Sequence, residues 1–312
     1  VSQAPYAIYL GSSGGTTAGN NNVTNNNITI YSLQSLGYGI AIVSLGVSNY
    51  NLIENNTIRA VSDGDNSVMG ITMVSTTTTI DYNTIQDNVV SVDGYSVNAI
   101  DLTCSGTSCD SNIIRNNIID INSTSTTNGI NFVTTASSTD SNVFKNNTIK
   151  INSSSIARGV HIQRNTIGTI SNTVLTENTF NVTTWATSSE IQGYGIFIDS
   201  SDTMNVSLNR INVSAPNAMA ANIHLEDGTD SGLFYDNIME GGDYGISVMS
   251  SSDNNNFSNE NMSDLKQSGV LVIGDSEYNK FENLTILNVT KAGFNISTAD
   301  YNSVVNNTLA DV

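Results

Sequence analysis

The sequence predicts an all-β protein, a single parallel β-helix of about eleven coils that spans residues 1–312. Two repeats support this prediction. The first is a polar pair ending in Asn and followed by alternating apolar residues, as in Asn146-Asn147-Thr148-Ile149, and it returns about every 22 to 31 residues. The second is a small residue followed by apolar residues at alternate positions, as in Gly159-Val160-His161-Ile162. No stretch has the 3.6-residue apolar period of an amphipathic helix, so we expect almost no helix.

The two repeats alternate along the chain, and each pair supplies at least two short strands to one coil. The polar pair ends at Asn26, Asn56, Asn83, Asn117, Asn147, Asn178, Asn209, Asn237, Asn261, Asn283 and Asn307. The second repeat begins at Ala7, Gly39, Gly70, Ala99, Gly129, Gly159, Gly195, Asn222, Gly245, Gly269 and Gly293. A single coil cannot bury its own apolar face, whereas stacked coils can.

The recurrent Asn and Gly residues have a physical role in such a stack. Asn tolerates the left-handed conformation at a corner, and its amide can bond the same amide one coil along, which predicts an Asn ladder. We expect buried members of this ladder, such as Asn146 and Asn306, to be poor glycan acceptors. The recurrent Gly suits a tight bend at the entry to the second strand.

The connections between the repeats are long in the first two thirds of the chain, as at 63–67, 122–127 and 185–190, and short in the last third. We expect the long loops to make one side of the rod the more individual surface. Ile8 and Leu309 already belong to standard strands, and no capping helix is evident. An uncapped β-helix exposes unpaired edges, which favours association through its ends.

The spacing from Leu309 through the C-terminus and on from Val1 to Ile8 is close to the spacing within the chain, so one molecule could follow another in register. The predicted partner is therefore a second copy in a head-to-tail homopolymer. The expected end contacts are Ala7, Ile8, Leu10, Asn307 and Leu309. The alternative is a segment of a longer surface protein whose caps lie elsewhere. The chain opens on Val1, from which we expect a mature chain without its signal peptide.

Composition and charge argue against several partners. The net charge is −18 with only 10 Lys and Arg, so a basic surface for nucleic acid or anionic lipid is missing. No apolar run approaches the length of a membrane span, so we expect no membrane insertion. The two cysteines, Cys104 and Cys109, predict a disulfide across one surface turn, with two free thiols as the alternative. A disulfide indicates an oxidising, extracellular location at the cell surface or beyond.

The outward middle position of the second repeat carries the main candidate chemistry. Asp101, Asn131 and His161 occupy it on successive coils about 4.8 Å apart, which suits acid–base work or cation binding. The alternative, which we favour, is a solvated strand face without catalytic residues. Asp63 and Asp65 form a weak calcium candidate, although acidic turns are common without metal. We expect no cofactor, and we find no compact carboxylate trio of a hydrolase or lyase.

Sequons of the form Asn-x-Ser/Thr make N-linked glycosylation available, although their number only slightly exceeds chance for an Asn-rich chain. The candidate acceptors are Asn22, Asn27, Asn55, Asn122, Asn152, Asn181, Asn205, Asn212, Asn256, Asn288 and Asn295.

The segments Asn-Asn-Thr-Ile and Tyr-Gly-Ile-Phe-Ile resemble the parallel β-helix repeats of the pectate-lyase-like superfamily, especially its NosD-like secreted and surface group. The resemblance covers essentially the whole chain and implies a right-handed β-helix. It is weak for function, because the superfamily contains both enzymes and non-catalytic surface proteins. The predicted function is a non-catalytic extracellular structural subunit that stacks into a filament or layer. The alternative is a secreted carbohydrate-active enzyme or carbohydrate-binding β-helix acting on polysaccharide.

Overall fold

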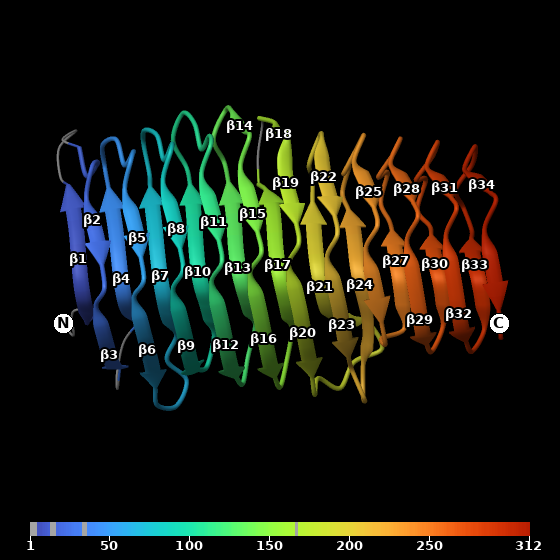
Figure 1. Cartoon of the computed structure of the whole chain (residues 1–312), viewed down its shortest axis with the longest axis horizontal. Helices are drawn as coiled ribbons and strands as arrows, with labels where there is room; N and C mark the ends of the chain where they lie inside the picture. The colour runs from blue at the N-terminus through green and yellow to red at the C-terminus, as the bar shows by residue number, and fades with distance from the viewer. Residues whose placement is uncertain (1–4, 13–16, 33–35, 166–167) are drawn as a thin grey trace.

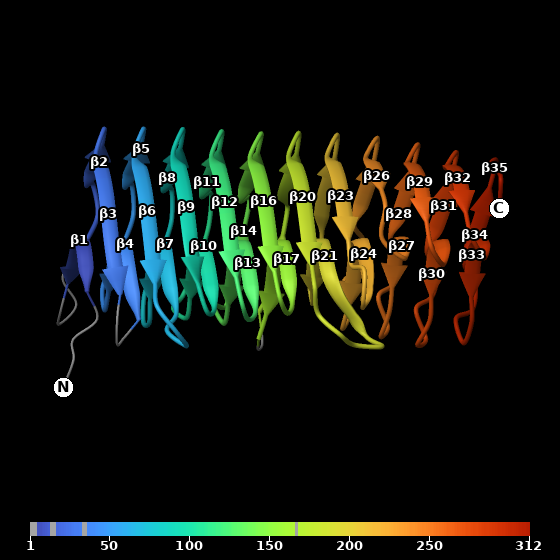
Figure 2. The same ribbon diagram turned by 90° about the horizontal axis from the view of Figure 1, so that it is seen from below.

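The computed structural model describes residues 5–12, 17–32, 36–165 and 168–312, and within these ranges the chain forms strands and no helix. Three sheets of eleven parallel strands run side by side along one rod, from the blue N-terminal end to the red C-terminal end (Figures 1 and 2). Each coil contributes one strand to each sheet in the order sheet A, sheet B, sheet C. The predicted fold class, a parallel β-helix, is confirmed.

Sheet A contains the strands of the Gly-type repeat: β1 (Tyr6–Ser12), β4 (Gly37–Ser44), β7 (Val68–Ser75), β10 (Val97–Cys104), β13 (Thr127–Thr134), β17 (Ala157–Arg164), β21 (Ile191–Asp199), β24 (Met219–Glu226), β27 (Tyr244–Val248), β30 (Ser268–Val272) and β33 (Ala292–Ile296). Sheet B contains short strands: β2 (Asn22–Thr24), β5 (Leu52–Glu54), β8 (Thr84–Gln86), β11 (Ile113–Arg115), β15 (Val143–Lys145), β19 (Thr173–Thr176), β22 (Met204–Ser207), β25 (Leu233–Tyr235), β28 (Asn256–Ser258), β31 (Lys280–Glu282) and β34 (Ser303–Val305).

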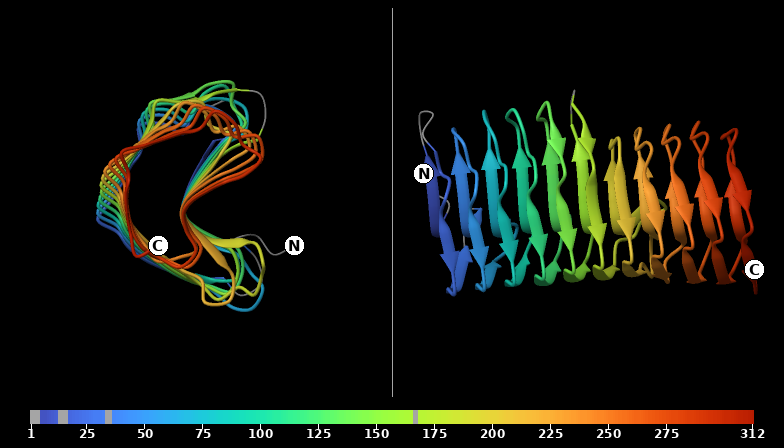
Figure 3. Two further views of the ribbon diagram at one scale, coloured as in Figure 1. Left: turned by 90° about the vertical axis from the view of Figure 1, so that its right-hand side faces the viewer. Right: turned by 45° about the horizontal axis from the view of Figure 1, so that its top comes forward.

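Sheet C follows the Asn pair: β3 (Asn27–Ser32), β6 (Thr57–Ser62), β9 (Val89–Gly94), β12 (Ile118–Ser123), β16 (Thr148–Ser153), β20 (Thr179–Thr184), β23 (Arg210–Ser214), β26 (Ile238–Glu240), β29 (Asn261–Leu265), β32 (Thr285–Val289) and β35 (Thr308–Ala310). Two further strands, β14 (Thr139–Asp140) and β18 (Ile170–Ser171), form a small parallel pair. The end-on view in Figure 3 shows the coils superposed in one cross-section.

The core is a set of rows that run along the rod inside the coils. Each strand alternates one inward and one outward side chain, so the same inward position recurs on every coil. In sheet B, Phe234, Phe257 and Phe281 stack in one such row, with ring centroids 4.5 and 5.1 Å apart. All three side chains are fully buried. The regular placement of few apolar residues therefore gives a continuous core, as the repeat predicts.

The predicted Asn ladder is present, but one residue of each Asn pair forms the ladder hydrogen bonds and the other adopts the left-handed corner conformation. Asn147 is buried; its backbone N–H and side-chain amide donate to Oδ1 of Asn178 over 2.9 and 3.0 Å. Asn146, the residue before it, is exposed and holds the left-handed conformation at φ 53°. The expectation that Asn146 and Asn306 are buried ladder members is wrong, because the left-handed corner turns their side chains outward.

The ladder also shifts three of the predicted repeat positions. Asn56 bonds Asn88, and Asn88 bonds Asn117, so Asn83 is not a member. Asn83 belongs to a second ladder one corner earlier, where it accepts from Asn51. The predicted members Asn261 and Asn283 each miss the ladder position by one residue: Asn261 follows Glu260, and Asn283 precedes Leu284. Spacing alone cannot separate two Asn-rich corners of the same coil.

The recurrent Gly of sheet A has a different cause from the predicted bend. Gly159 does not have a positive φ. A Cβ there would lie 2.4 Å from the carbonyl oxygen of Gly195 and 2.6 Å from the ring of Phe180. The position needs Gly because sheets A and C approach each other closely inside the coil. This close approach holds the narrow part of the cross-section together.

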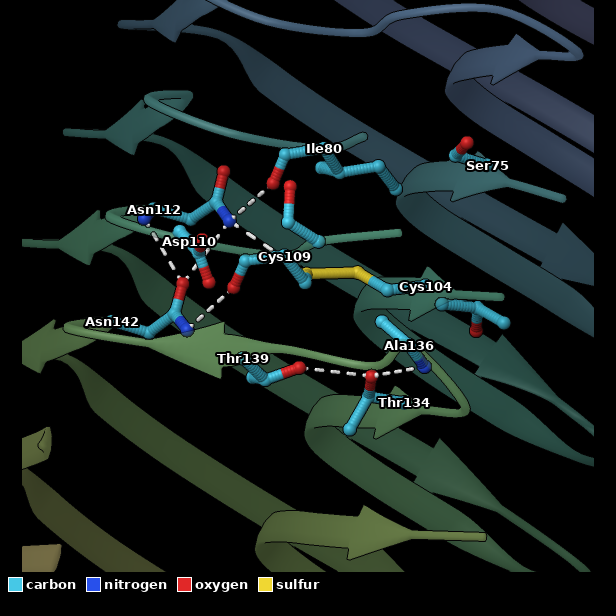
Figure 4. Close-up of a disulfide and its surroundings, with 12 residues drawn as sticks. Ser75, Ile80, Cys104, Cys109, Asp110, Asn112, Thr134, Ala136, Thr139 and Asn142 are labelled. Atoms are coloured by element: carbon cyan, nitrogen blue, oxygen red, sulfur yellow. Dashed lines mark hydrogen bonds between the residues drawn. A yellow bond between two sulfur atoms is a disulfide. The ribbon is translucent and has the colours of Figure 1, made fainter. Parts of the chain in front are cut away.

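Cys104 and Cys109 form a disulfide, with their Cα atoms 6.0 Å apart, and both side chains are buried (Figure 4). The predicted bond is therefore present, but it lies at the core rather than on a surface turn. On the next coil Thr134 occupies the register position of Cys104, and its hydroxyl lies 3.0 Å from that of Thr139. A hydroxyl pair thus takes the place of the disulfide one coil along.

Candidate functional site

The outward face of sheet A is buried over most of the rod. Most members of the row at its middle position have exposed fractions of 0 to 7%. These buried members are Ala41, Thr72, Asp101, Asn131, His161, Phe197, His224, Ser247 and Leu271, while Tyr9 and Asn295 at the two ends of the row are exposed. The favoured prediction of a solvated strand face is wrong here, because neighbouring side chains along and across the sheet cover one another. Burial of polar groups requires partners.

Asp101, Asn131 and His161 form a continuous hydrogen-bonded chain across three coils. The Asn131 amide donates to Oδ1 of Asp101 over 2.7 Å, and Oδ1 of Asn131 lies 2.8 Å from Nδ1 of His161. Asn98 and Thr103 also donate to the Asp101 carboxyl group, over 3.1 and 3.3 Å. The structure therefore brings together the three residues of the sequence hypothesis. Their catalytic role remains a prediction.

Burial shifts the two titratable groups of this chain toward their neutral forms. It raises the pKa of the Asp101 carboxyl, against the effect of the hydrogen bonds from Asn131, Thr103 and Asn98. Burial, together with the nearby Arg158 charge, lowers the pKa of His161 to about 3. A neutral His161 accepts or donates hydrogen bonds at physiological pH but does not supply positive charge.

An aromatic cluster continues the row toward the C-terminal end. The rings of Phe197 and His224 stack with centroids 5.1 Å apart, and Tyr194 lies 5.2 Å from His224. The guanidinium carbon of Arg158 sits 4.8 Å from the Phe197 ring centroid and 5.7 Å from that of Tyr194. These are cation–π distances, and desolvation strengthens such contacts. Burial lowers the pKa of Arg158.

A cavity of about 590 Å³ opens beside this cluster. Its floor is the outward face of β21, β24 and β27, including Tyr194, His224 and Tyr244. Residues 189–192, where the long β20–β21 connection enters β21, line another side of it. Figure 2 shows this yellow connection reaching past the neighbouring coils. The β20–β21 connection is therefore one long loop that makes this side of the rod distinct, as the sequence predicts.

His224 and Glu226 form a hydrogen-bonded pair in the lining of the cavity. Nε2 of His224 lies 3.3 Å from Oε2 of Glu226, and the His224 side chain is only 3% exposed. This hydrogen bond is the main cause that lowers the pKa of Glu226. Nδ1 of His224 is buried and has no hydrogen-bond partner. A buried polar atom without a partner is uncommon and requires an explanation.

Sequence reasoning missed Tyr194 as a site residue, and it considered Glu226 only as part of an acidic turn for calcium, not as a partner of His224. His224 and Phe197 were visible as outward positions of the Gly-type repeat. The missing signal was the neighbouring outward position two residues along the strand, which places Glu226 beside His224. The long connection at 185–190 pointed to this part of the rod. Nothing in the repeat indicated that it would fold across three strands.

The remaining predicted sites lie elsewhere. Asp63 and Asp65 occupy an exposed turn, and nowhere in the described ranges do three or more His, Cys, Asp or Glu residues come together as a metal site. Nine of the candidate glycan acceptors are exposed, while Asn205 and Asn256 are half-buried. Among the proposed end contacts, Ala7 is exposed, Ile8 and Leu10 are half-buried against the core, Asn307 is half-buried, and Leu309 is 49% exposed.

Three comparisons relate the chain to known proteins. Residues 186–312 match the model of the family described as periplasmic copper-binding protein (NosD). The A-module of mannuronan C-5 epimerase AlgE6 from Azotobacter vinelandii is similar in structure, with a TM-score of 0.47 and 12% identity over 95% of this chain and 91% of that chain. A similarity at this level carries no argument about activity. No curated protein matches the sequence.

The donor groups of the chain do not fit a copper centre built from imidazole and thiolate. Both cysteines are in the disulfide. The ring of Phe197 separates His161 from His224 in the row, with centroid distances of 5.2 and 5.1 Å, so the two imidazoles do not meet at one ion. No helix long and apolar enough to cross a membrane occurs in the described part of the chain. The chain is a parallel β-helix repeat protein, and its residues 186–312 are similar to the NosD family.

Proposed function

We propose that this protein is a carbohydrate-binding β-helix that holds a glycan against sheet A, outside the cytoplasm. The observation that carries the proposal is the cavity of about 590 Å³ beside Tyr194, His224 and Tyr244. Its size is in the range of small-molecule sites, which combine apolar walls with a few placed polar groups. The disulfide and the periplasmic description of the similar family support an oxidising location.

The lining suits a sugar ring. Tyr244, which is half-buried, offers a flat aromatic surface that packs against the apolar face of a ring, and Tyr194 lines the cavity with only 8% of its surface exposed. Glu226 and Gln192 offer hydrogen-bonding groups for hydroxyls.

The test is binding of a panel of soluble oligosaccharides, measured by calorimetry with the wild type and two tyrosine variants. Tyr244→Ala removes one aromatic wall and is expected to weaken binding about tenfold. Tyr278→Ala is the matched control, since Tyr278 is 54% exposed and does not line the cavity. Equal weakening by both variants, or no binding of any oligosaccharide, would rule the proposal out. Unchanged oligosaccharide length after incubation distinguishes binding from cleavage.

A second candidate is the structural role: a head-to-tail homopolymer with N-linked glycans at the cell surface. The observation that favours it is the last coil, where β33, β34 and β35 each have a strand partner on one side. Ile296, Val304 and Leu309 there are 36, 45 and 49% exposed. Either a second copy of this protein or a continuation of a longer polypeptide would cover this coil. Sedimentation of the wild type and of Leu309→Lys separates these two cases. Self-association that the wild type shows and the variant loses indicates a second copy.

A further inference from the structure

The polar atoms of the cavity floor are hydrogen-bond acceptors whose neighbouring donors are already used. Where Nε2 of an uncharged His224 ring carries the proton donated to Glu226, Nδ1 is left as an acceptor. That nitrogen is buried without a partner in a side chain that is only 3% exposed, on the floor of the cavity. Its own accessible surface is below 1 Å², so the acceptors that a ligand meets directly are the Glu226 carboxylate and the phenol oxygens of the lining.

Both tyrosine hydroxyls of the floor already donate a hydrogen bond within the protein. The Tyr194 hydroxyl donates to the carbonyl oxygen of Ile191 over 2.5 Å. The Tyr244 hydroxyl donates to the sulfur of Met219 over 3.7 Å. Each phenol oxygen therefore offers only its acceptor capacity to a ligand. Ser189 and Gln192, which belong to the β20–β21 connection and the start of β21, remain able to donate.

The charged residues around the cavity also favour a ligand that donates hydrogen bonds. Two carboxylates, Glu190 and Glu226, line the cavity. One cation, Arg158, lies close by, but it packs on the rings of Phe197 and Tyr194 and is not among the lining residues. The aromatic faces of Tyr194 and Tyr244 attract cations through their ring quadrupoles. The whole chain carries −18, which raises the local concentration of cationic ligands.

We propose that the cavity binds a primary ammonium group, as carried by an amino sugar. Ammonium is the group with three donors and no acceptor, which matches the carboxylates and the two phenol oxygens of the lining. This inference rests on the proposed carbohydrate function and names its substrate class: glycans with free amino groups rather than uronates. The uronate carboxylate would meet Glu190 and Glu226 as like charges and find few donors.

The experiment compares four probes by calorimetry, at a pH where the probe amine is protonated and at two salt concentrations. They are glucosamine, an oligosaccharide of glucosamine, its N-acetylated form and an oligosaccharide of a uronic acid of equal length. We expect the glucosamine oligosaccharide to bind at least about tenfold more tightly than the other two oligosaccharides. Glu226→Gln keeps the side-chain shape and should cost about tenfold of that affinity.

Asp63→Asn is the matched control, because it removes one negative charge from an exposed turn away from the cavity. Loss of affinity in Asp63→Asn equal to that in Glu226→Gln would reduce the effect to net charge and overturn the inference. Equal binding of the three oligosaccharides, or tightest binding of the uronate, would overturn it while leaving the carbohydrate function standing. Binding of glucosamine without any oligosaccharide would support the ammonium site and contradict the proposed function. No binding of any probe would contradict both.

Discussion

The backbone N–H and the side-chain amide of Asn237 both donate to the carboxyl group of Glu260, over 2.7 and 2.9 Å. Glu260 is only 1% exposed and stands where the preceding coils have Asn. An Asn side chain accepts these bonds without charge, whereas a carboxylate in this place must lose its hydration. Burial accordingly raises the pKa of Glu260 to about 8.

The first prediction is a loss of stability as the pH rises from about 5 to about 8. The folded protein prefers protonated Glu260, so its stabilising effect is complete below the ordinary pKa of 4.5 and declines as the pH rises toward about 8. The free energy of unfolding should fall by on the order of 3 kcal/mol between pH 5 and pH 8. Denaturant unfolding across this range measures it.

Glu260→Asn should remove most of that pH dependence by restoring the amide of the ladder. Glu240→Gln, at a carboxylate that is 46% exposed, serves as the control and should leave the pH dependence intact. If Glu260→Asn and the wild type lost stability in parallel, another group would be responsible.

The second prediction separates the two residues of one Asn pair. Asn147→Ala removes the amide that donates to Asn178 and to the carbonyl oxygen of Ile114, and it leaves buried partners unpaired. We expect unfolding to become easier by about 2–4 kcal/mol. Asn146→Gly should have an effect within about 0.5 kcal/mol in either direction, because Gly adopts the positive φ of this exposed corner without strain. Equal losses in the two variants would contradict the assignment of the ladder.

A third prediction follows from the hydroxyl pair beside the disulfide. Thr134 and Thr139 repeat the positions of Cys104 and Cys109 one coil along, and their hydroxyls lie 3.0 Å apart. The double variant Thr134→Cys/Thr139→Cys should form a second disulfide on oxidative refolding. Intact mass under non-reducing conditions and thiol titration detect it. The two single variants are controls and should each keep one free thiol; a double variant with two titratable thiols would contradict the equivalence of the two coils.

A fourth prediction concerns glycan occupancy in a host that modifies sequons. The side chain of Asn152 accepts a hydrogen bond from the indole of Trp185 over 2.8 Å, so its amide is held. Asn122 and Asn181 are exposed at the equivalent outward face of sheet C. We expect lower occupancy at Asn152 than at Asn122, and a rise at Asn152 in Trp185→Ala, by peptide mapping. Asn181 gives the internal reference, and a parallel rise there would mean that the variant acts generally.

The fold was predictable because its signal is a repeat. Alternate apolar residues at a fixed period have one good explanation, a stack of coils, and the structure confirms it. The identity of the ladder residue was less accessible, since Asn146 and Asn147 are both suited to a corner by residue type alone. Only the backbone conformation shows which side chain turns inward.

The candidate site was predictable in part for a related reason. Register places Asp101, Asn131 and His161 in one row, and their sequence positions suffice to predict this. Burial of the row depends on the width of the neighbouring side chains and on the fold of the 185–190 connection, neither of which has a local pattern. The cavity beside Tyr244 therefore appears only once the coils are assembled.

The central claim is that a sugar occupies the cavity on the outward face of sheet A. A crystal structure of the wild-type protein with a glucosamine oligosaccharide tests it most directly. The account predicts a sugar ring against Tyr194 and Tyr244, with its ammonium group within hydrogen-bonding distance of Glu226. An oligosaccharide bound elsewhere on the rod, with the cavity holding only water, would contradict it.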